Sequence, residues 1–287
     1  MKDHPVVARL LSRRCRQVLR QRTRVLATGD KDAIHDLRVA TRRLQEALEF
    51  LSPALPARPV RRLGRRARRI RRELGTIRNL DVLVQLVARF SRRLSAPQRR
   101  VVAPLAKRLA EEAAVLRRRD RAGRRRGTMA LPGIGKRVRA VQSRIILPAD
   151  FSVRERARRV LHDRTRDVVD ALPPAEGGDA AALHALRIAV KRYRYTLEIL
   201  DQTGAKKARP AISAARALQT RLGELHDLDV FMELLSRSTS PASRGLVALF
   251  GTRRRRLLSQ AQAALASFDA RRLTRSALGE SKEESAA

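Results

Sequence analysis

The sequence predicts an all-α protein in which an internal duplication has produced two four-helix bundles. Proline and glycine divide the chain into long stretches rich in Ala, Leu, Arg and Glu, which are good helix formers. No segment sustains the alternation of apolar and polar residues that marks a β-strand. Two motifs also recur in the same order at nearly the same spacing. With 43% hydrophobic residues in a length of 287, the chain can bury the cores that such bundles need.

The expected helices lie between these breaks. In the first half we place them at 5–27, 30–52, 58–93, with a break near Gly75, and 97–122. In the second half we place them at 152–172, 180–203, 207–238, with a break near Gly223, and 242–268. The domain organisation that follows is a first bundle at 1–126, a linker at 127–150, a second bundle at 151–268 and a disordered tail at 269–287.

The duplication is visible as two pairs of matching segments. Residues 29–51 and 178–200 are identical at 11 of 23 positions without gaps, at an offset of 149. Residues 74–87 and 222–235 match at an offset of 148, and both carry a Leu-Gly followed by a Leu-Asp. Two motifs that keep their order and spacing indicate a repeated structural unit.

The first repeated motif predicts a helix with one charged and one apolar face, because each residue turns 100° on a helix. In the first copy His35, Arg38 and Arg42 share the charged face, and in the second copy His184, Arg187 and Lys191 do. Asp30 and Asp179 precede the periodic runs and are expected to be the N-caps. A solvated face with intrahelical ion pairs would explain one such stripe, but it gives no reason for the same residues to recur.

An arginine run over 58–77 is the most basic part of the chain. Its apolar residues are spaced by three and four, as in a core seam, and nearly every residue between them is arginine. We expect this helix to bind an anion through four of its arginines, Arg62, Arg65, Arg66 and Arg69. The alternative is a surface helix neutralised by counterions.

The net charge of +37 points to a polyanionic partner, because such a charge makes a folded protein repel itself. Arginine outnumbers lysine by 57 to 8 among the 65 basic residues, and its planar fork suits phosphate oxygens. An arginine-rich genome would explain that ratio but not the net charge. Residues 1–143 carry 39 basic and 11 acidic residues, against 26 and 17 in 144–287. The first half should therefore dominate capture of the anion.

Several other classes of protein are excluded or set aside. The single Cys15 allows no intramolecular disulfide and fits a reducing, cytoplasmic compartment. No apolar run approaches the ~18 residues of a membrane span, so we expect no membrane partner. The histidines lack metal-ligand spacing and are surrounded by arginine, so we expect neither a metal nor another cofactor. Walker-type loops and magnesium-binding carboxylate clusters are missing, so we expect no catalytic residues.

The repeated segments HDLRVATRR (35–43) and HALRIAVKR (184–192) resemble the CHAD family, the conserved histidine α-helical domain. The resemblance covers about 5–268 and implies two four-helix bundles related by pseudo-twofold symmetry. It implies that the chain binds inorganic polyphosphate through a basic central surface, in some members at polyphosphate granules. The binding residues that it implies are His35, Arg38, Arg42, Arg43, His184, Arg187, Lys191, Arg192 and Arg194. Gln45 stands where the second copy has Arg194. The alternative partner is the phosphate backbone of a nucleic acid, although the chain has few aromatic residues to stack on bases.

Overall fold

The structure is a computed structural model that describes residues 3–125, 133–143, 145, 147–203, 206–237 and 240–280. Within these ranges the chain forms α-helices and two short 3-10 helices and has no strand, so the predicted all-α class is confirmed. The chain divides into two compact units, one made of Met1–Ala88 and Pro104–Arg156, the other of Arg89–Ala103 and Ala157–Ala287.

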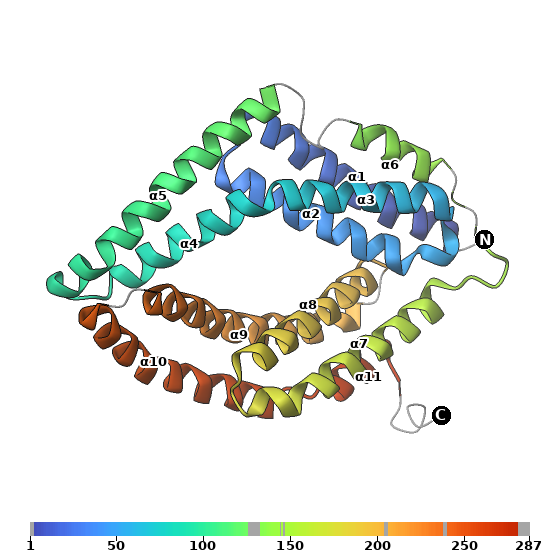
Figure 1. The fold of residues 1–287 in the computed structure, drawn as a ribbon. Coiled ribbons are helices and arrows are strands. Elements are labelled where there is room, and N and C mark those ends of the chain that lie inside the picture. Colours follow the sequence, from blue (N-terminus) through green and yellow to red (C-terminus); the bar gives the residue numbers. More distant parts are fainter. Residues whose placement is uncertain are drawn as a thin grey trace. The chain divides into compact units, whose positions relative to one another are not determined.

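The first unit is built mainly on α1 (Asp3–Ala27), α2 (Lys31–Phe50), α3 (Ala57–Glu73) and α6 (Ile134–Gln142), which lie side by side (Figure 1). The 3-10 helix η1 (Ser52–Ala54) connects α2 to α3. Two further helices, α4 (Gly75–Ser91) and α5 (Ala96–Arg125), begin or end in the second unit. The core contains Leu11 of α1, Leu37 and Leu44 of α2, and Leu63 and Ile70 of α3, each at most 1% exposed. Burial of the spaced leucines explains why the arginine run of α3 folds as a helix.

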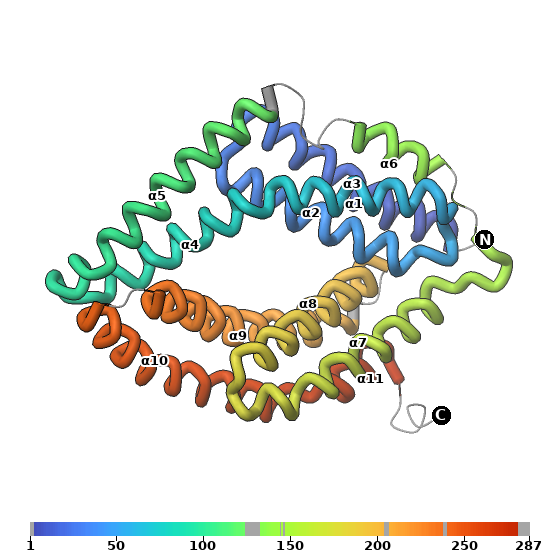
Figure 2. Tube along the Cα trace, in the orientation of Figure 1, coloured from blue at the N-terminus to red at the C-terminus, as the bar shows by residue number. Residues whose placement is uncertain are grey.

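The second unit contains α7 (Val153–Glu176) from Ala157 onward, together with α8 (Ala180–Gln202), η2 (Lys206–Ala208), α9 (Arg209–Ser236), α10 (Pro241–Ala266) and α11 (Ala270–Leu278). Helix α9 packs along both α8 and α10 (Figure 2). Phe90, at the end of α4, stacks on Phe231 with ring centroids 4.8 Å apart and meets Phe250 edge to face. This aromatic cluster fixes Arg89–Ala103 to the second unit.

Of the two breaks that the sequence predicts within helices, one is present and the other is absent. The break expected near Gly75 is present, since α3 ends at Glu73 and α4 begins at Gly75. The break expected near Gly223 is wrong, because α9 runs without interruption from Arg209 to Ser236. An isolated glycine within a helix costs only ~1 kcal/mol, which the packing of a 28-residue helix easily offsets.

The tail expected to be disordered over 269–287 instead forms α11. Asp269 caps it by accepting from the backbone N–H of Arg272 at 2.8 Å, and Gly279 ends it at φ 72°. The buried side chains of α11 are small. The hydroxyl oxygen of Thr274 lies 2.6 Å from that of Thr165 in α7. A core contact made by small and polar side chains leaves little apolar periodicity in the sequence. Residues 281–287 of the expected tail lie outside the described residues.

The linker expected at 127–150 contains α6, which packs on α1 and α3. Its buried face consists of Ile134, Val138 and Val141. The part of this expected linker at 127–132 lies outside the described residues.

Candidate functional site

The histidine–arginine face of α2 is positioned by its N-cap and its apolar face. Asp30, in the extended conformation, accepts hydrogen bonds from the backbone N–H groups of Asp32 and Ala33 at 2.9 and 2.6 Å. These bonds lower the pKa of the Asp30 carboxyl, Ala33 contributing most. The predicted cap is therefore confirmed, and so is the one at Asp179 of α8. The apolar face is buried, which leaves His35 and Arg42 exposed.

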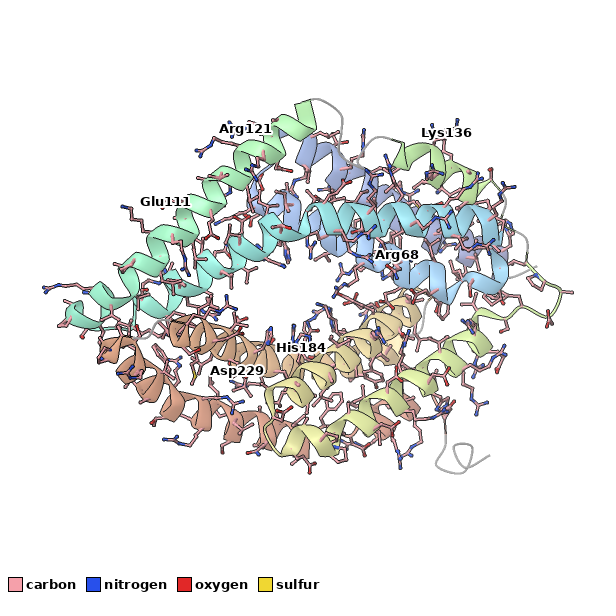
Figure 3. The ribbon with its side chains drawn as sticks, in the orientation of Figure 1. Arg68, Glu111, Arg121, Lys136, His184 and Asp229 are labelled. Carbon is pink, nitrogen blue, oxygen red and sulfur yellow. The ribbon has the colours of Figure 1, made fainter. Side chains whose placement is uncertain are left out.

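A cavity of about 600 Å³ lies beside α2 and α3, and all the described residues that line it are arginines. Two of its seven residues come from α2 and five from α3, namely Arg38, Arg42, Arg65, Arg68, Arg69, Arg71 and Arg72. Arg68 projects from the side of α3 that faces away from α6 (Figure 3). Such a set presents many N–H donors in planar forks, which is the chemistry that recognises phosphate.

Two of these arginines bridge the helices through neutral acceptors. Arg38 of α2 donates to the backbone carbonyl of Arg71 in α3. Arg71 in turn donates to the carbonyl of Thr41 at 3.2 Å and to the side-chain oxygen of Gln45, both in α2. The guanidinium groups are thereby held in place by acceptors that carry no charge.

The electrostatics of the cavity favour an anion. The pKa of Arg38 is lowered by burial and then by Arg42 and Arg78. The pKa of Arg71 is lowered by burial and then by Arg42, Arg38 and Arg68, whereas Glu46 raises it. A lowered arginine pKa records the cost of placing like charges together out of water, and a bound anion relieves that cost.

The arginines predicted from the sequence fall into two groups in the first unit. Arg38, Arg42, Arg65 and Arg69 line the cavity, and Arg69 also pairs with Glu73 at 2.8 Å. Four predicted residues lie outside the lining, namely His35, Arg43, Arg62 and Arg66. Arg66 extends toward Gly133, the residue before α6. Its pKa is lowered by burial and then by Arg69 and Arg137.

Three lining residues were missed by the sequence analysis: Arg68, Arg71 and Arg72. All belong to the arginine run that the sequence singled out. Because nearly every polar residue of this helix is arginine, the sequence does not show which arginines face α2. Only the packing of α3 on α2 identifies them.

In the second unit, two histidines lie together. The rings of His184 on α8 and His226 on α9 have centroids 5.1 Å apart (Figure 3 labels His184). Burial lowers the pKa of His226, and Arg187 and then His184 lower it further, whereas Asp227 and Asp229 raise it. Sequence reasoning considered His226 only as a metal ligand. It is better described as a polar neighbour of the predicted residues His184 and Arg187.

The remaining predicted residues of α8 differ in exposure. Arg192 is exposed and Lys191 is half-buried. Arg194 is buried, with only 10% of its side chain exposed, and it is paired with Glu198 at 2.5 Å. Its Nε also donates to Gln219 of α9 at 2.9 Å. Arg194 is therefore committed to protein partners within the helix pair.

A smaller cavity of about 110 Å³ in the second unit has a mixed lining of Arg89, Phe90, Arg93, Glu224, Arg253 and Leu257. Arg89 and Arg253 lie over the Phe90 ring at 5.0 and 5.8 Å from its centroid. These contacts fit cation–π support of the aromatic cluster.

The aspartates of the two Leu-Asp segments pair with arginine. Asp81, 1% exposed, accepts from Arg117, and Asp229 accepts from Arg254 at 2.6 Å. In the described part of the chain, no three His, Cys, Asp or Glu side chains are grouped to hold a metal ion. None of the described helices has the length and hydropathy of a membrane span.

The helices and the two histidine–arginine faces define an all-helical protein with a strongly cationic surface. Residues 9–236 match the CHAD domain, so the chain belongs to the CHAD domain family, as the resemblance in its motifs predicted. Among solved structures it is similar to the crystal structure of the CHAD domain from the plant Ricinus communis. That match has 22% identity and a TM-score of 0.65 and covers 93% of this chain and 92% of the other.

A second similar structure is PptA from Streptomyces chartreusis, with 18% identity and a TM-score of 0.59. It covers 92% of this chain and 97% of the other. No curated protein sequence matches the chain. At these identities the structural matches establish a shared CHAD-like fold.

Proposed function

We propose that this chain binds inorganic polyphosphate and that the arginine cavity of the first unit makes the primary contact. The observation that carries the proposal is the lining of that cavity, which consists of seven arginines. Polyphosphate carries about one negative charge per phosphate and has no bases, so dense guanidinium forks satisfy it fully.

The aromatic residues argue for a bare phosphate chain over a single-stranded nucleic acid. Base recognition needs exposed rings for stacking. Both tyrosines are buried, Tyr193 at 0% and Tyr195 at 4% exposed. Five of the six phenylalanines are also buried, at 6% exposed or less, namely Phe50, Phe90, Phe231, Phe250 and Phe268. The phosphate backbone of a duplex is the alternative ligand, and the net charge of +37 favours it.

The other predicted residues extend the proposed contact surface. In the first unit these are His35, Arg43, Arg62 and Arg66, and in the second they are His184, Arg187, Lys191 and Arg192. We leave Arg194 out of the contact set because Glu198 neutralises it. The two histidines act as hydrogen-bond donors to phosphate or orient nearby arginines. The chain binds without catalysis, and binding directs it to polyphosphate granules.

We also propose that the chain arose by duplication of a four-helix bundle. The repeated segments begin at capped helices, with Asp30 at the start of α2 and Asp179 at the start of α8. Both copies place their histidine at the fifth residue of the helix. The predicted bundle limits of 1–126 and 151–268 belong to this proposal.

A competition titration tests the proposed function. Labelled long-chain polyphosphate is displaced by duplex DNA, single-stranded RNA and short polyphosphate at near-physiological salt. We expect polyphosphate to outcompete nucleic acid by orders of magnitude at equal phosphate concentration. Equal competition per phosphate would contradict the proposal and make the chain a general polyanion binder.

A further inference from the structure

An arginine–glutamine hydrogen bond joins α2 to α3 in the first unit and α8 to α9 in the second. The arginine and the glutamine exchange helices between the two units. In the first unit the arginine is on the second helix: Arg71 of α3 donates to Gln45 of α2. In the second unit it is on the first helix: Arg194 of α8 donates to Gln219 of α9 at 2.9 Å.

The exchanged residues occupy matching positions, Gln45 and Arg194 within the first repeated segments and Arg71 and Gln219 three residues before the second. Gln45 and Arg194 differ by 149, the offset of the first motif, and Arg71 and Gln219 differ by 148, the offset of the second. Each unit therefore keeps one Arg–Gln pair across its helices and reverses the direction of donation.

The reversal changes what surrounds the arginine. Arg194 lies beside Glu198, whose carboxylate is also 3.7 Å from Arg216. Glu49, which matches Glu198 at an offset of 149, is bonded instead by the Gln45 amide at 2.8 Å. The arginine of the first unit thus meets a neutral amide where the arginine of the second unit meets a carboxylate.

The position of Arg71 also bears on the cavity. Its guanidinium donates to α2, and its own carbonyl accepts from Arg38, so three hydrogen bonds join the two helices at this point. Both arginines line the cavity. A side chain that is fixed by neutral acceptors has no carboxylate as its hydrogen-bond partner, although Glu46 acts on the charge of Arg71, and it loses little conformational entropy on binding.

We infer that the Arg71–Gln45 pair is an interhelical clasp and that Arg71 contacts the anion, because its place on α3 puts a preorganised cation, hydrogen-bonded to neutral acceptors, in the cavity. The matching pair in the second unit is a clasp whose arginine is withdrawn from ligand binding. The part concerning the anion rests on the proposed function, whereas the clasp does not.

An exchange of the pair separates the clasp from the cation. The variants are Arg71→Gln, Gln45→Arg and the double variant Gln45→Arg/Arg71→Gln, which gives the first unit the arrangement of the second. Thermal unfolding reports the clasp, and titration with long-chain polyphosphate at several salt concentrations reports the anion site. The matched control is the reverse exchange in the second unit, Arg194→Gln/Gln219→Arg.

We expect both single variants to unfold at lower temperature and the double variant to recover most of the loss, because its arginine again faces a glutamine. The affinity should not recover. Arg71→Gln and the double variant should both bind about tenfold more weakly, equivalent to ~1.4 kcal/mol, with a shallower salt dependence. The control exchange should stay stable and bind as tightly as the wild type or more tightly.

Three outcomes would overturn parts of the inference. Additive losses in the thermal cycle would refute the clasp. Wild-type affinity in the double variant would refute the role of Arg71. A tenfold loss in the control would place Arg194 at the ligand. If the wild-type chain does not bind polyphosphate, the proposed function fails and the role of Arg71 in binding fails with it, while the thermal cycle still decides the clasp.

Discussion

Replacing Arg68 and Arg72 by glutamine removes two guanidinium groups from the cavity while preserving good helix formers on α3. Both side chains line the cavity and are exposed, so their loss leaves no buried polar group unsatisfied. The fold should therefore survive, which far-UV circular dichroism and thermal unfolding can check. Any change in affinity then reflects the ligand contacts.

The magnitude follows from the exposure of the two side chains. A charge-assisted hydrogen bond contributes ~1.5–3 kcal/mol when water is excluded, and exposure and salt reduce this toward 1 kcal/mol. Two such contacts give a loss of about 2–3 kcal/mol, or roughly 30- to 150-fold weaker binding. The slope of log affinity against log salt should also become shallower by about 1.4, at ~0.7 per phosphate contact on a single flexible chain.

The matched control is Arg58→Gln/Arg62→Gln, on the same helix, with the same spacing and the same loss of charge. Both residues are exposed and neither lines the cavity. The nearest lining residue, Arg65, is ~4.5 Å along the helix axis from residue 62 and ~10.5 Å from residue 58, against a Debye length of ~8 Å at physiological salt, so the control retains only part of the electrostatic effect. The control should weaken binding less than about threefold in a fluorescence anisotropy titration with labelled polyphosphate.

Equal losses in the two double variants would refute the reasoning. They would mean that total charge governs binding and that the cavity is no site. Such a result would also make Arg62, which we place at the edge of the contact surface, as important for binding as the arginines that line the cavity.

Three further outcomes are expected. Polyphosphate should raise the pKa of His226, which burial and neighbouring cations lower in the free chain. Affinity should then increase as pH falls through the bound-state pKa, with proton uptake in calorimetry that His226→Gln abolishes. Thr274→Val removes a hydrogen-bond partner 3.1 Å from the buried Tyr193 hydroxyl and should lower the free energy of unfolding in urea by ~1–2 kcal/mol. Asp30→Ala should lower the melting temperature of the chain at neutral pH. Because the cap bonds, led by that of Ala33, lower the Asp30 pKa, the difference should disappear as pH falls through that lowered value.

Local rules account for what the sequence predicted well. The caps at Asp30 and Asp179 and the apolar face of α2 depend on residues within one turn or one helix, so their patterns can be read directly. The Leu-Gly motif shows where such rules stop. It coincides with a break between α3 and α4 at Gly75, but the same motif at Gly223 lies within a continuous helix.

The surroundings of the two glycines differ although the motif is the same. A Cβ placed on Gly75 would lie 3.2 Å from a guanidinium nitrogen of Arg38, whereas nothing lies within 4 Å of such an atom on Gly223. Close approach of a cavity arginine thus accompanies the break in one copy only. That difference depends on tertiary contacts with another helix, which the motif does not encode.

The partners of the arginines decide which of them can serve a ligand. Arg117, Arg194 and Arg254 each pair with a carboxylate, and their charge is satisfied within the fold. Arg38 and Arg71 donate to carbonyl and amide oxygens instead, and these uncharged acceptors fix their geometry, although Glu46 also acts on the charge of Arg71. A sequence with 57 arginines among its 65 basic residues does not distinguish these two groups, since both are arginines on helices. Neutral acceptors at α2 and α3 are therefore the feature that converts an arginine-rich surface into a proposed anion site.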